Sequence, residues 1–596
     1  MNTRQKLVLP FAFAVLLAFG LSSCGKSADD IAAASGNSLL AYVPDDSPYL
    51  AGNLAPIPGD VIDATFRRAQ PVLDAVQTVL ADSSLKLSGS AAQEHPEMAI
   101  SGAILDELDG KLNRAGLESL GFTMESYQVV YGLGVFPVLR LSLGNAQALR
   151  DTIGRIETNS GIAFPEQQHQ GQAYWRLEAE SADADHGIAA AIYFAIVEES
   201  AGAHLAVGVL PIASETELLP AFLGQAKPAG TTAAQRIAEI NKAYGYSPHG
   251  TGLLDFQRLF DQLVDENSLL RRTLEDSGAD IDEHFDEVCR AEFRDLIARA
   301  PRMVAGTTEM TSDVMGGQYR LEMADDLASQ LAALVSSVPP APANSDRLFE
   351  FAFGIRIGAA RDFLIRKATD LSQRNYQCEA LEGINKQASE ALVTLNRPVP
   401  PLVNNFLGFR ASLSALPEDE SALHEVKGTM ALHVAQPEMF VGMAQMFLPQ
   451  LAGLQIAKGQ PPVRLPEALI PMPGVVAYAA MSDEVLGIAV GQGEEARLPD
   501  YLEEDSKGDG SFLSINYDMA TYMEKVDQLT ESLKAEGVTN DSGTGDDFEN
   551  SDDREQAIAM AEALQEALRN MAGRSYMSLR FDEHGFALDS KVTFTD

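Results

Sequence analysis

A repeated order of strand and helix is the feature that most restricts how this chain folds. In three stretches, apolar residues first alternate and then recur every three or four positions. Alternation turns one face of a strand inward, and the longer period turns one stripe of a helix inward. These residues are Leu139, Leu141, Leu143, Leu149, Ile153 and Ile156; Tyr319, Leu321, Met323, Leu327, Leu331 and Leu334; and Met430, Leu432, Val434, Phe440, Ala444 and Phe447.

Helix starts and preceding strands complete this unit. Asn145, Asp325 and the pair Gln436-Pro437 stand where the three helices are expected to begin. A second strand-like run precedes each stretch, so each unit is a β-hairpin that leads into a helix. These preceding runs are 127–135, 302–310 and 406–413.

Two further units occur in the same order in both halves of the chain. The matching segments are 205–209 and 486–490, 219–222 and 498–501, and 252–256 and 514–519. We therefore expect an α+β fold of two related modules, in which antiparallel or mixed curved sheets pack against helices. Chance similarity between generic strand–helix patterns is the alternative.

A Pro-rich stretch at residues 339–342 separates the two expected modules. The chain has 596 residues, too many for one hydrophobic core. We expect a first α+β module at 39–325, a helix and Pro-rich linker at 326–345, and a second module at 346–596. Within the second module, residues 536–553 are acidic and rich in Gly, Ser and Asn, which predicts a disordered loop.

The N-terminus has the order of a secretory signal. Arg4 and Lys6 precede an apolar run at residues 7–21, and Leu-Ser-Ser-Cys then ends at Cys24. This order is typical of a signal peptide, here residues 1–23. The apolar run is short for a spanning helix, which needs about 20 residues. The last four residues resemble the lipobox of bacterial lipoproteins; an ordinary signal peptide with a chance cysteine is the alternative.

The lipoprotein resemblance implies that Cys24 becomes the N-terminus and carries palmitate and other acyl chains. Residues 24–38 are then a lipidated cysteine and flexible tether, with an end-to-end distance of roughly 20 Å. In that family, aspartate after the cysteine commonly retains a protein at the inner membrane. Gly25 and Lys26 follow here, which implies the periplasmic face of the outer membrane.

Composition and charge exclude some partners. Hydrophobic residues make up 46% and charged residues 22%, as in globular proteins. The net charge of −41 becomes −43 when Arg4 and Lys6 leave with the signal peptide. Such a charge argues against nucleic-acid binding and against electrostatic docking on anionic lipid. A solvated acidic surface explains it; a cationic partner or metal buffering is the alternative.

Cys289 and Cys378 are the two cysteines besides Cys24. An even pair in an oxidising compartment predicts a disulfide between them. Two buried free thiols, or a chemical role, are the alternatives. Neither cysteine has the CxxC or CxxH spacing of a metal site.

Few residues have the spacing of catalytic chemistry. Asp255 and Asp518 occupy the same place in both halves, as helix N-caps or as functional carboxylates. Residues 505–516 resemble an EF-hand loop, but Lys507 and Asn516 stand at ligand positions and argue against calcium. The sequence contains no HExxH, GxSxG or Walker A motif. We therefore expect no enzyme activity, no cofactor and no metal site.

Residues 42–49 read Tyr-Val-Pro-Asp-Asp-Ser-Pro-Tyr. This segment, together with the repeated units, resembles the sequences of bacterial envelope proteins of the uncharacterised DUF3352 type. That family has no assigned activity, so the resemblance implies no site residues.

We expect a non-catalytic cell-envelope lipoprotein that binds or scaffolds other envelope proteins at the periplasmic membrane face, held there by its lipid anchor. The alternative is a carrier or receptor for a lipid or other apolar ligand. A soft apolar stripe favours that alternative, although ordinary core packing also explains it. The stripe consists of Phe440, Met443, Met446, Phe447 and Leu448.

Overall fold

In the computed structural model, most of the chain between residues 36 and 594 is described. The described ranges are 36–87, 96–178, 189–228, 231–416, 425–451, 453–470, 474–504, 510–522, 524 and 573–594. Cys24, the expected signal peptide and the expected acidic loop at 536–553 lie outside these ranges.

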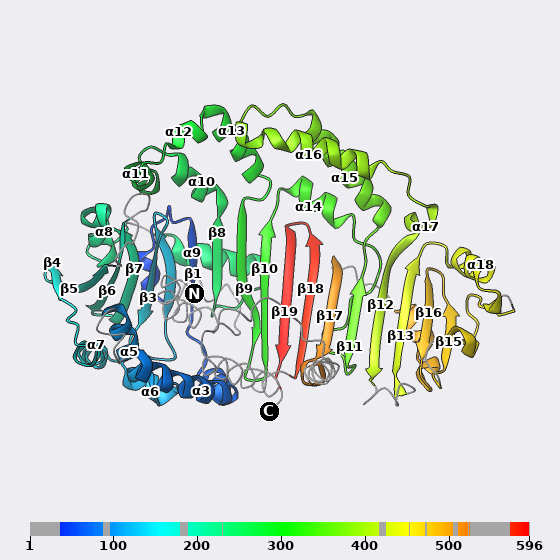
Figure 1. Cartoon of the computed structure of the whole chain (residues 1–596), viewed down its shortest axis with the longest axis horizontal. Helices are drawn as coiled ribbons and strands as arrows, with labels where there is room; N and C mark the ends of the chain where they lie inside the picture. Colours follow the sequence, from blue (N-terminus) through cyan, green and yellow to red (C-terminus); the bar gives the residue numbers. More distant parts are fainter. Residues whose placement is uncertain are drawn as a thin grey trace.

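A single antiparallel sheet of 19 strands forms the body of the described part (Figure 1). The strands of its first half are β1 (Tyr49–Gly52), β2 (Gln128–Leu133), β3 (Phe136–Ser142), β4 (Gln167–His169), β5 (Gln172–Glu178), β6 (Ala190–Glu199), β7 (Gly202–Pro211), β8 (Thr251–Asp255), β9 (Arg302–Met310) and β10 (Val314–Glu322). Those of its second half are β11 (Phe349–Phe353), β12 (Phe406–Ala415), β13 (Lys427–Val434), β14 (Val463–Arg464), β15 (Ala477–Met481), β16 (Val485–Val490), β17 (Ser511–Asp518), β18 (Arg574–Asp582) and β19 (Gly585–Thr593). The coarse expectation of an α+β fold is confirmed, and of the expected antiparallel or mixed sheets the structure has one large antiparallel sheet.

The spatial order of the strands is the same in both halves. Outward from the centre, the first half runs β10, β9, β8, β1, β2, β3, β7, β6, β5. The second half runs β19, β18, β17, β11, β12, β13, β16, β15, β14. Strands β10 and β19 pair along nine residues each and join the halves into one sheet.

Helices surround this sheet along its upper and lower margins (Figure 1). Those of the first half are α3 (Gly59–Leu87), α5 (Pro96–Leu108), α6 (Arg114–Ser119), α7 (Ala146–Ser160), α8 (Glu215–Phe222), α9 (Ala233–Tyr244), α10 (Phe256–Val264), α11 (Leu269–Asp276), α12 (Ile281–His284) and α13 (Glu287–Ile297). They are followed by α14 (Asp325–Ala332), α15 (Ile357–Gln373), α16 (Glu379–Leu395), α17 (Pro401–Asn404), α18 (Pro437–Phe447) and α19 (Leu498–Glu503). Short 3₁₀ turns lie at Ser38–Tyr42, Ile212–Ser214, Pro449–Leu451, Glu467–Leu469 and Glu494–Ala496.

The helices begin where the sequence places their starts. Asn145 caps α7, because its side chain accepts a hydrogen bond from the backbone N–H of Ala148 at 3.1 Å. Asp325 and Pro437 are the first residues of α14 and α18. These three expectations are confirmed.

The Pro-rich segment after α14 is packed rather than free. Val338 and Ala341 are buried. The Ala341 N–H donates to Ser514 Oγ at 2.7 Å, and Asn516 Nδ2 donates to the Pro342 carbonyl at 2.5 Å. This segment therefore lies against β17 as part of the second half's core. At the N-terminus, the end of the expected tether is also fixed, because Asn37 is buried and bonds to Asn53.

The main hydrophobic core lies between one face of the first half's sheet and helices α8 and α9. It includes Leu50, Tyr131, Val138, Tyr193, Phe222 and Ile237. A smaller core in the second half packs α19 on β13 and β16 through Ala431, Ala489, Leu498 and Leu502. Helices α8 and α9 of the first half and α19 of the second half cover the same face of the sheet.

Candidate functional site

Near the middle of the sheet, the covered face carries buried polar side chains and the open face carries apolar ones. On β10, Gln318 and Arg320 are each 3% exposed, whereas Tyr319 between them is 55% exposed. On β13, Met430 is likewise 55% exposed. The expectation that the apolar strand positions all face the core is therefore wrong for Tyr319 and Met430, since the helices cover the opposite face.

The open face is apolar from one side of the sheet to the other. Residues paired across antiparallel strands lie on the same face, so the register defines rows that cross the sheet. One row crosses 17 of the 19 strands without a charged side chain. Its residues are Trp175, Phe194, Val207, Leu139, Val130, Ala51, Gly252, Ala305, Tyr319, Leu588, Leu579, Leu513, Phe353, Phe409, Leu432, Leu486 and Met481.

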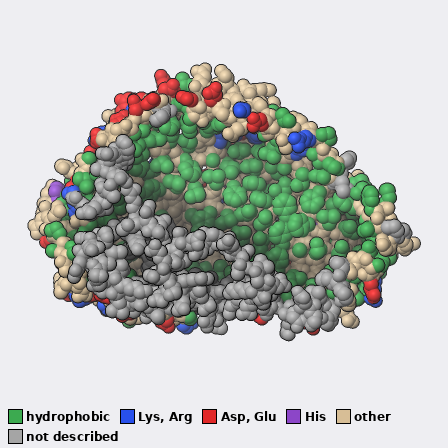
Figure 2. Space-filling view, in the orientation of Figure 1, with side chains coloured by type: hydrophobic (Ala, Val, Ile, Leu, Met, Phe, Trp, Pro, Cys, Tyr) green, Lys and Arg blue, Asp and Glu red, His purple; other side chains and the backbone are tan. Residues whose placement is uncertain are grey.

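A second row runs beside the first across the second half. It consists of Gly317, Ser590, Met577, Ile515, Phe351, Ala411, Met430, Ile488, Ala479 and Val463. We call the part of these two rows that runs from Tyr319 and Gly317 on β10 across the second half the apolar sheet face. Figure 2 shows this side as a hollowed surface on which hydrophobic side chains gather. A contiguous exposed apolar surface is typical of an interaction or ligand-binding site.

Aromatic rings pack against one another on the apolar sheet face. Phe351 and Phe409 stack with ring centroids 5.0 Å apart, and Phe353 lies 6.2 Å from Phe409. In the first half, by contrast, the end of the long row is covered, because Trp175 packs in a cluster with Leu149 and Ile153 of α7. The open apolar surface therefore belongs mainly to the second half.

Three buried arginines hold the covered face together. Arg140, Arg320 and Arg410 are at most 3% exposed. Each lies over a tyrosine ring, with the guanidinium carbon 3.9 Å from Tyr42, 4.7 Å from Tyr244 and 4.3 Å from Tyr501, respectively. Buried charges require such partners, because leaving them unpaired costs several kcal/mol.

Arg140 and Arg410 also bond to the ends of helices. Arg140 donates to the carbonyl of Phe222 at 2.7 Å, at the end of α8. Arg410 donates to the carbonyl of Tyr501 at 3.4 Å and pairs with Glu504 at 2.6 Å, at the end of α19. A cation is favourable at the C-terminus of a helix.

Each of these two arginines has a buried histidine nearby. Burial, then Arg140, lowers the pKa of His204 to about 3, and the ring bonds to that guanidinium at 2.9 Å. Burial, then Arg410, lowers the pKa of His433 to about 4. Both rings are therefore neutral at physiological pH.

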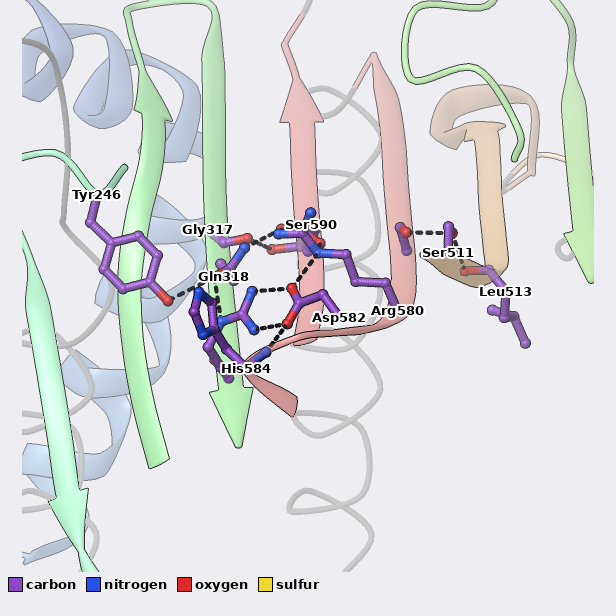
Figure 3. Close-up of polar contacts among 12 residues, drawn as sticks. Tyr246, Gly317, Gln318, Ser511, Leu513, Arg580, Asp582, His584 and Ser590 are labelled. Carbon is purple, nitrogen blue, oxygen red and sulfur yellow. Dashed lines mark hydrogen bonds and ion pairs between the residues drawn. The ribbon is translucent and has the colours of Figure 1, made fainter. Parts of the chain in front are cut away.

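The third arginine belongs to a polar network where β10 meets β19, drawn in Figure 3. Arg320 donates to both carboxylate oxygens of Asp582, at 2.6 and 2.7 Å. Burial opposes ionisation of Asp582, but these hydrogen bonds bring its pKa below the usual range. Tyr246 donates to Gln318 at 2.9 Å beside this pair. These side chains form their hydrogen bonds with one another, which is typical of a network with a structural role.

The two cysteines expected to pair are joined in the structure. The Cys289 and Cys378 sulfurs form a disulfide, with Cα atoms 4.6 Å apart. Both are buried in a cluster that includes Tyr376 and Leu381. The bond links α13 of the first half to the start of α16, and Glu292 accepts the Cys378 N–H at 3.1 Å beside it.

The repeated aspartates are helix caps. Asp255 accepts the N–H of Arg258 at 3.0 Å, and Asp518 accepts the N–H of Thr521 at 2.9 Å. The capping interpretation is confirmed. Of the EF-hand-like segment, residues 505–509 lie outside the described ranges, and Asn516 is buried on β17.

The soft apolar stripe is only partly packed. Phe440 and Met443 are half-buried, but Met446 and Phe447 are 73% and 76% exposed and Leu448 is exposed as well. Ordinary core packing therefore does not explain the last three residues.

A half-open pocket of about 840 Å³ lies beside α19. It is lined by His433, Asp483, Glu484, Glu503 and Glu504, among others. Within the described ranges, no group of three His, Cys, Asp or Glu side chains is placed to hold a metal ion. No helix there is both long enough and apolar enough to cross a bilayer.

Sequence reasoning missed the phenylalanines of β11 and β12. Phe349, Phe351 and Phe353 alternate with other residues, which is a signal that was present in the sequence. No protein-family model, curated protein or solved structure matches this chain.

Proposed function

We propose that this protein is a non-catalytic carrier or receptor that binds a lipid or another long apolar ligand on the apolar sheet face. The observation that carries the proposal is the uncharged row of paired residues that crosses the sheet. Its second-half members, apart from Met481, are partly or fully exposed. Burying one such aromatic or aliphatic side chain contributes about 1.5–3 kcal/mol. A ligand that covers several of them is therefore bound without any charged contact.

The chemistry of this face favours hydrocarbon over a polar ligand. The apolar sheet face contains no charged residue, and its polar side-chain groups are limited to the hydroxyls of Ser590 and Tyr319. Hydrocarbon chains need only apolar contact, whereas a polar ligand needs hydrogen-bond partners. A role as scaffold for another envelope protein is the weaker proposal, since protein interfaces combine an apolar centre with a polar rim.

We place this activity at the cell envelope as part of the same proposal. The sequence of residues 1–24 supports a signal peptide and a lipid on Cys24, facing the periplasm from the outer membrane. A short tether would keep the apolar sheet face within reach of membrane lipid.

We further propose that the halves 39–325 and 346–596 are related modules. The identical strand order supports this, and so does the register. Leu141 pairs with Leu205 as Leu432 pairs with Leu486. The capping aspartates are also paired alike, each with an arginine on the next strand.

These aspartates carry the closest correspondence. Asp255 pairs with Arg302, and Asp518 pairs with Arg574. The N–H groups of Asp255 and Asp518 donate to the Pro48 and Leu348 carbonyls, both at 2.8 Å. Generic hairpins have no reason to share this combination of register, cap and backbone bond.

The experiment compares ligand binding by variants of the apolar sheet face. The test protein lacks residues 1–24, a change that removes none of the described structure. Tyr319→Asp and Met430→Asp place a charge on the face, and Leu364→Asp and Val393→Asp place one on α15 and α16. These control side chains are 49% and 70% exposed.

Titration with a fluorescent long-chain fatty acid measures the affinity, and mass spectrometry identifies lipids that co-purify. We expect about a tenfold loss of affinity for each face variant, the equivalent of one lost apolar side chain. The control variants should bind like the wild type. Absence of bound lipid, or equal affinity in all four variants, would reject the proposal.

A further inference from the structure

An uncharged segment surrounds α18. Residues 439–457 include no Asp, Glu, Lys or Arg over 19 positions, in a chain that is 22% charged. The segment begins after Glu438 and ends before Lys458. It contains most of α18, the 3₁₀ turn at Pro449–Leu451 and the chain that follows.

The structure leaves this segment largely unburied. Among its described residues, only Val441 is buried. Met446, Phe447 and Leu448, which we call the α18 tip, are all exposed at the end of the helix. In Figure 1, α18 lies at the outer end of the second half, near β13 and β16. The tip is therefore an exposed apolar helix end in the outer part of the second half.

The net charge of the chain indicates which kind of lipid surface the α18 tip can contact. An anionic surface would repel a protein whose net charge is −41. The uncharged α18 tip has no such conflict with a zwitterionic bilayer, where Phe, Leu and Met side chains enter the boundary between headgroups and acyl chains. Such contact is peripheral, because no helix of the described residues is suited to crossing a bilayer.

We propose that the α18 tip inserts into the surface of a zwitterionic lipid bilayer. This contact is separate from any lipid on Cys24 and does not depend on a ligand on the apolar sheet face. It would hold the second half against the membrane, with the apolar sheet face beside the lipid.

Fluorescence tests insertion directly. Phe447→Trp places a reporter at the tip, and the chain's own tryptophan, Trp175, is buried. Val393→Trp places the same reporter on α16, at a position that is similarly exposed. The test protein again lacks residues 1–24, so that no lipid anchor contributes. The vesicles are phosphatidylcholine, with and without bromine on the acyl chains.

We expect vesicles to shift the Phe447→Trp emission to the blue and brominated chains to quench it. The Val393→Trp emission should not change. A tip reporter that brominated lipid does not quench would overturn the proposal. A blue shift that depends on protein concentration and not on vesicles would also overturn it, because the tip would then contact a second copy of the chain.

Vesicle sedimentation adds the energetic test. Phe447→Asp should lower partitioning onto phosphatidylcholine by about tenfold, and Val393→Asp should change it less than about twofold. Addition of anionic phosphatidylglycerol should weaken binding. Equal partitioning of the two variants, or stronger binding to anionic vesicles, would contradict the proposal. Retention of fatty-acid binding by Phe447→Asp keeps this result separate from the proposed ligand site.

Discussion

Gln318 and Asp589 face each other across β10 and β19, and Gln318 Nε2 donates to Asp589 Oδ1 at 2.6 Å. The β10–β19 pairing extends equally far on both sides of this residue pair. Two residues away on either side, Arg320 pairs with Ala587 and Gly316 pairs with Lys591. This hydrogen bond therefore lies at the centre of the junction through which the two halves form one sheet.

Removal of this central amide should destabilise the fold. In Gln318→Leu, the buried Tyr246 hydroxyl loses its acceptor at 2.9 Å, and Asp589 loses its 2.6 Å donor but keeps Arg580 at 3.0 Å. Unpaired buried polar groups cost about 1–3 kcal/mol, so we expect a fall of that size in the free energy of unfolding, measured in urea. Gln147→Leu, on the exposed face of α7, should change it by less than about 0.5 kcal/mol. An equal effect of both variants would contradict the structural role of the junction.

The disulfide should contribute strongly to stability. The bond between Cys289 and Cys378 spans 89 residues, and in the chain-entropy model such a loop contributes about 4–5 kcal/mol, less any native strain. The double variant Cys289→Ser, Cys378→Ser should therefore unfold at lower urea than the oxidised wild type. Reduction should shift the wild-type midpoint and leave the double variant unchanged. A wild-type midpoint that does not respond to reduction would contradict this prediction.

Local features of this fold could be predicted from sequence, but the side of the sheet that is covered could not. The capping roles of Asn145 and Asp255 follow from residue type and position alone, since a cap needs only a short polar side chain before a helix. Alternation correctly marks Tyr319 and Met430 as sharing a face with other apolar residues. It does not say which face the helices cover, because a period of two is the same for either side.

The pairing of strands that joins the two halves also could not be predicted from the sequence. Strand β10 pairs with β19, and Gln318 lies 271 positions from Asp589. No hairpin turn or short spacing connects these strands. The pairing of β10 with β19 also brings Arg320 within reach of Asp582, which lies on β18, the strand next to β19. Composition and periodicity carry no signal for such a contact.

Acid should weaken the fold through His433. Its folded pKa of about 4 lies below the ordinary value of 6.5, because of burial and then Arg410. The unfolded state therefore binds the proton first as the pH falls. The stability contribution is complete above about pH 6.5 and is lost progressively as the pH falls toward about 4.

Substitution isolates this contribution. Between pH 7 and about 4.5, the unfolding free energy of the wild type should fall by about 2 kcal/mol more than that of His433→Gln. Urea unfolding at the two pH values measures the difference. His584→Gln, in the exposed turn between β18 and β19, is the matched control and should parallel the wild type. Parallel curves for the wild type and His433→Gln would contradict the prediction.

One buried arginine from each half, Arg140 and Arg410, offers a test of whether the halves are related. In the first half, Arg140 on β3 is paired with Val129 on β2. At the corresponding pair in the second half the arginine lies on the other strand, with Arg410 on β12 opposite Ala431 on β13. If the halves are related, the second half should also accept its arginine on β13 instead of β12, as the first half has it on β3.

A strand exchange of the arginine tests that equivalence. Arg410→Val alone removes a buried cation from Glu504 and from the Tyr501 carbonyl and ring, and should cost about 3–5 kcal/mol. Ala431→Arg alone places two cations together and should also destabilise. The double variant Arg410→Val, Ala431→Arg restores the arrangement of the first half, so its unfolding free energy should exceed that of either single variant. A double variant with additive losses, measured as a double-mutant cycle in urea, would show that the two positions are not equivalent and would count against related modules.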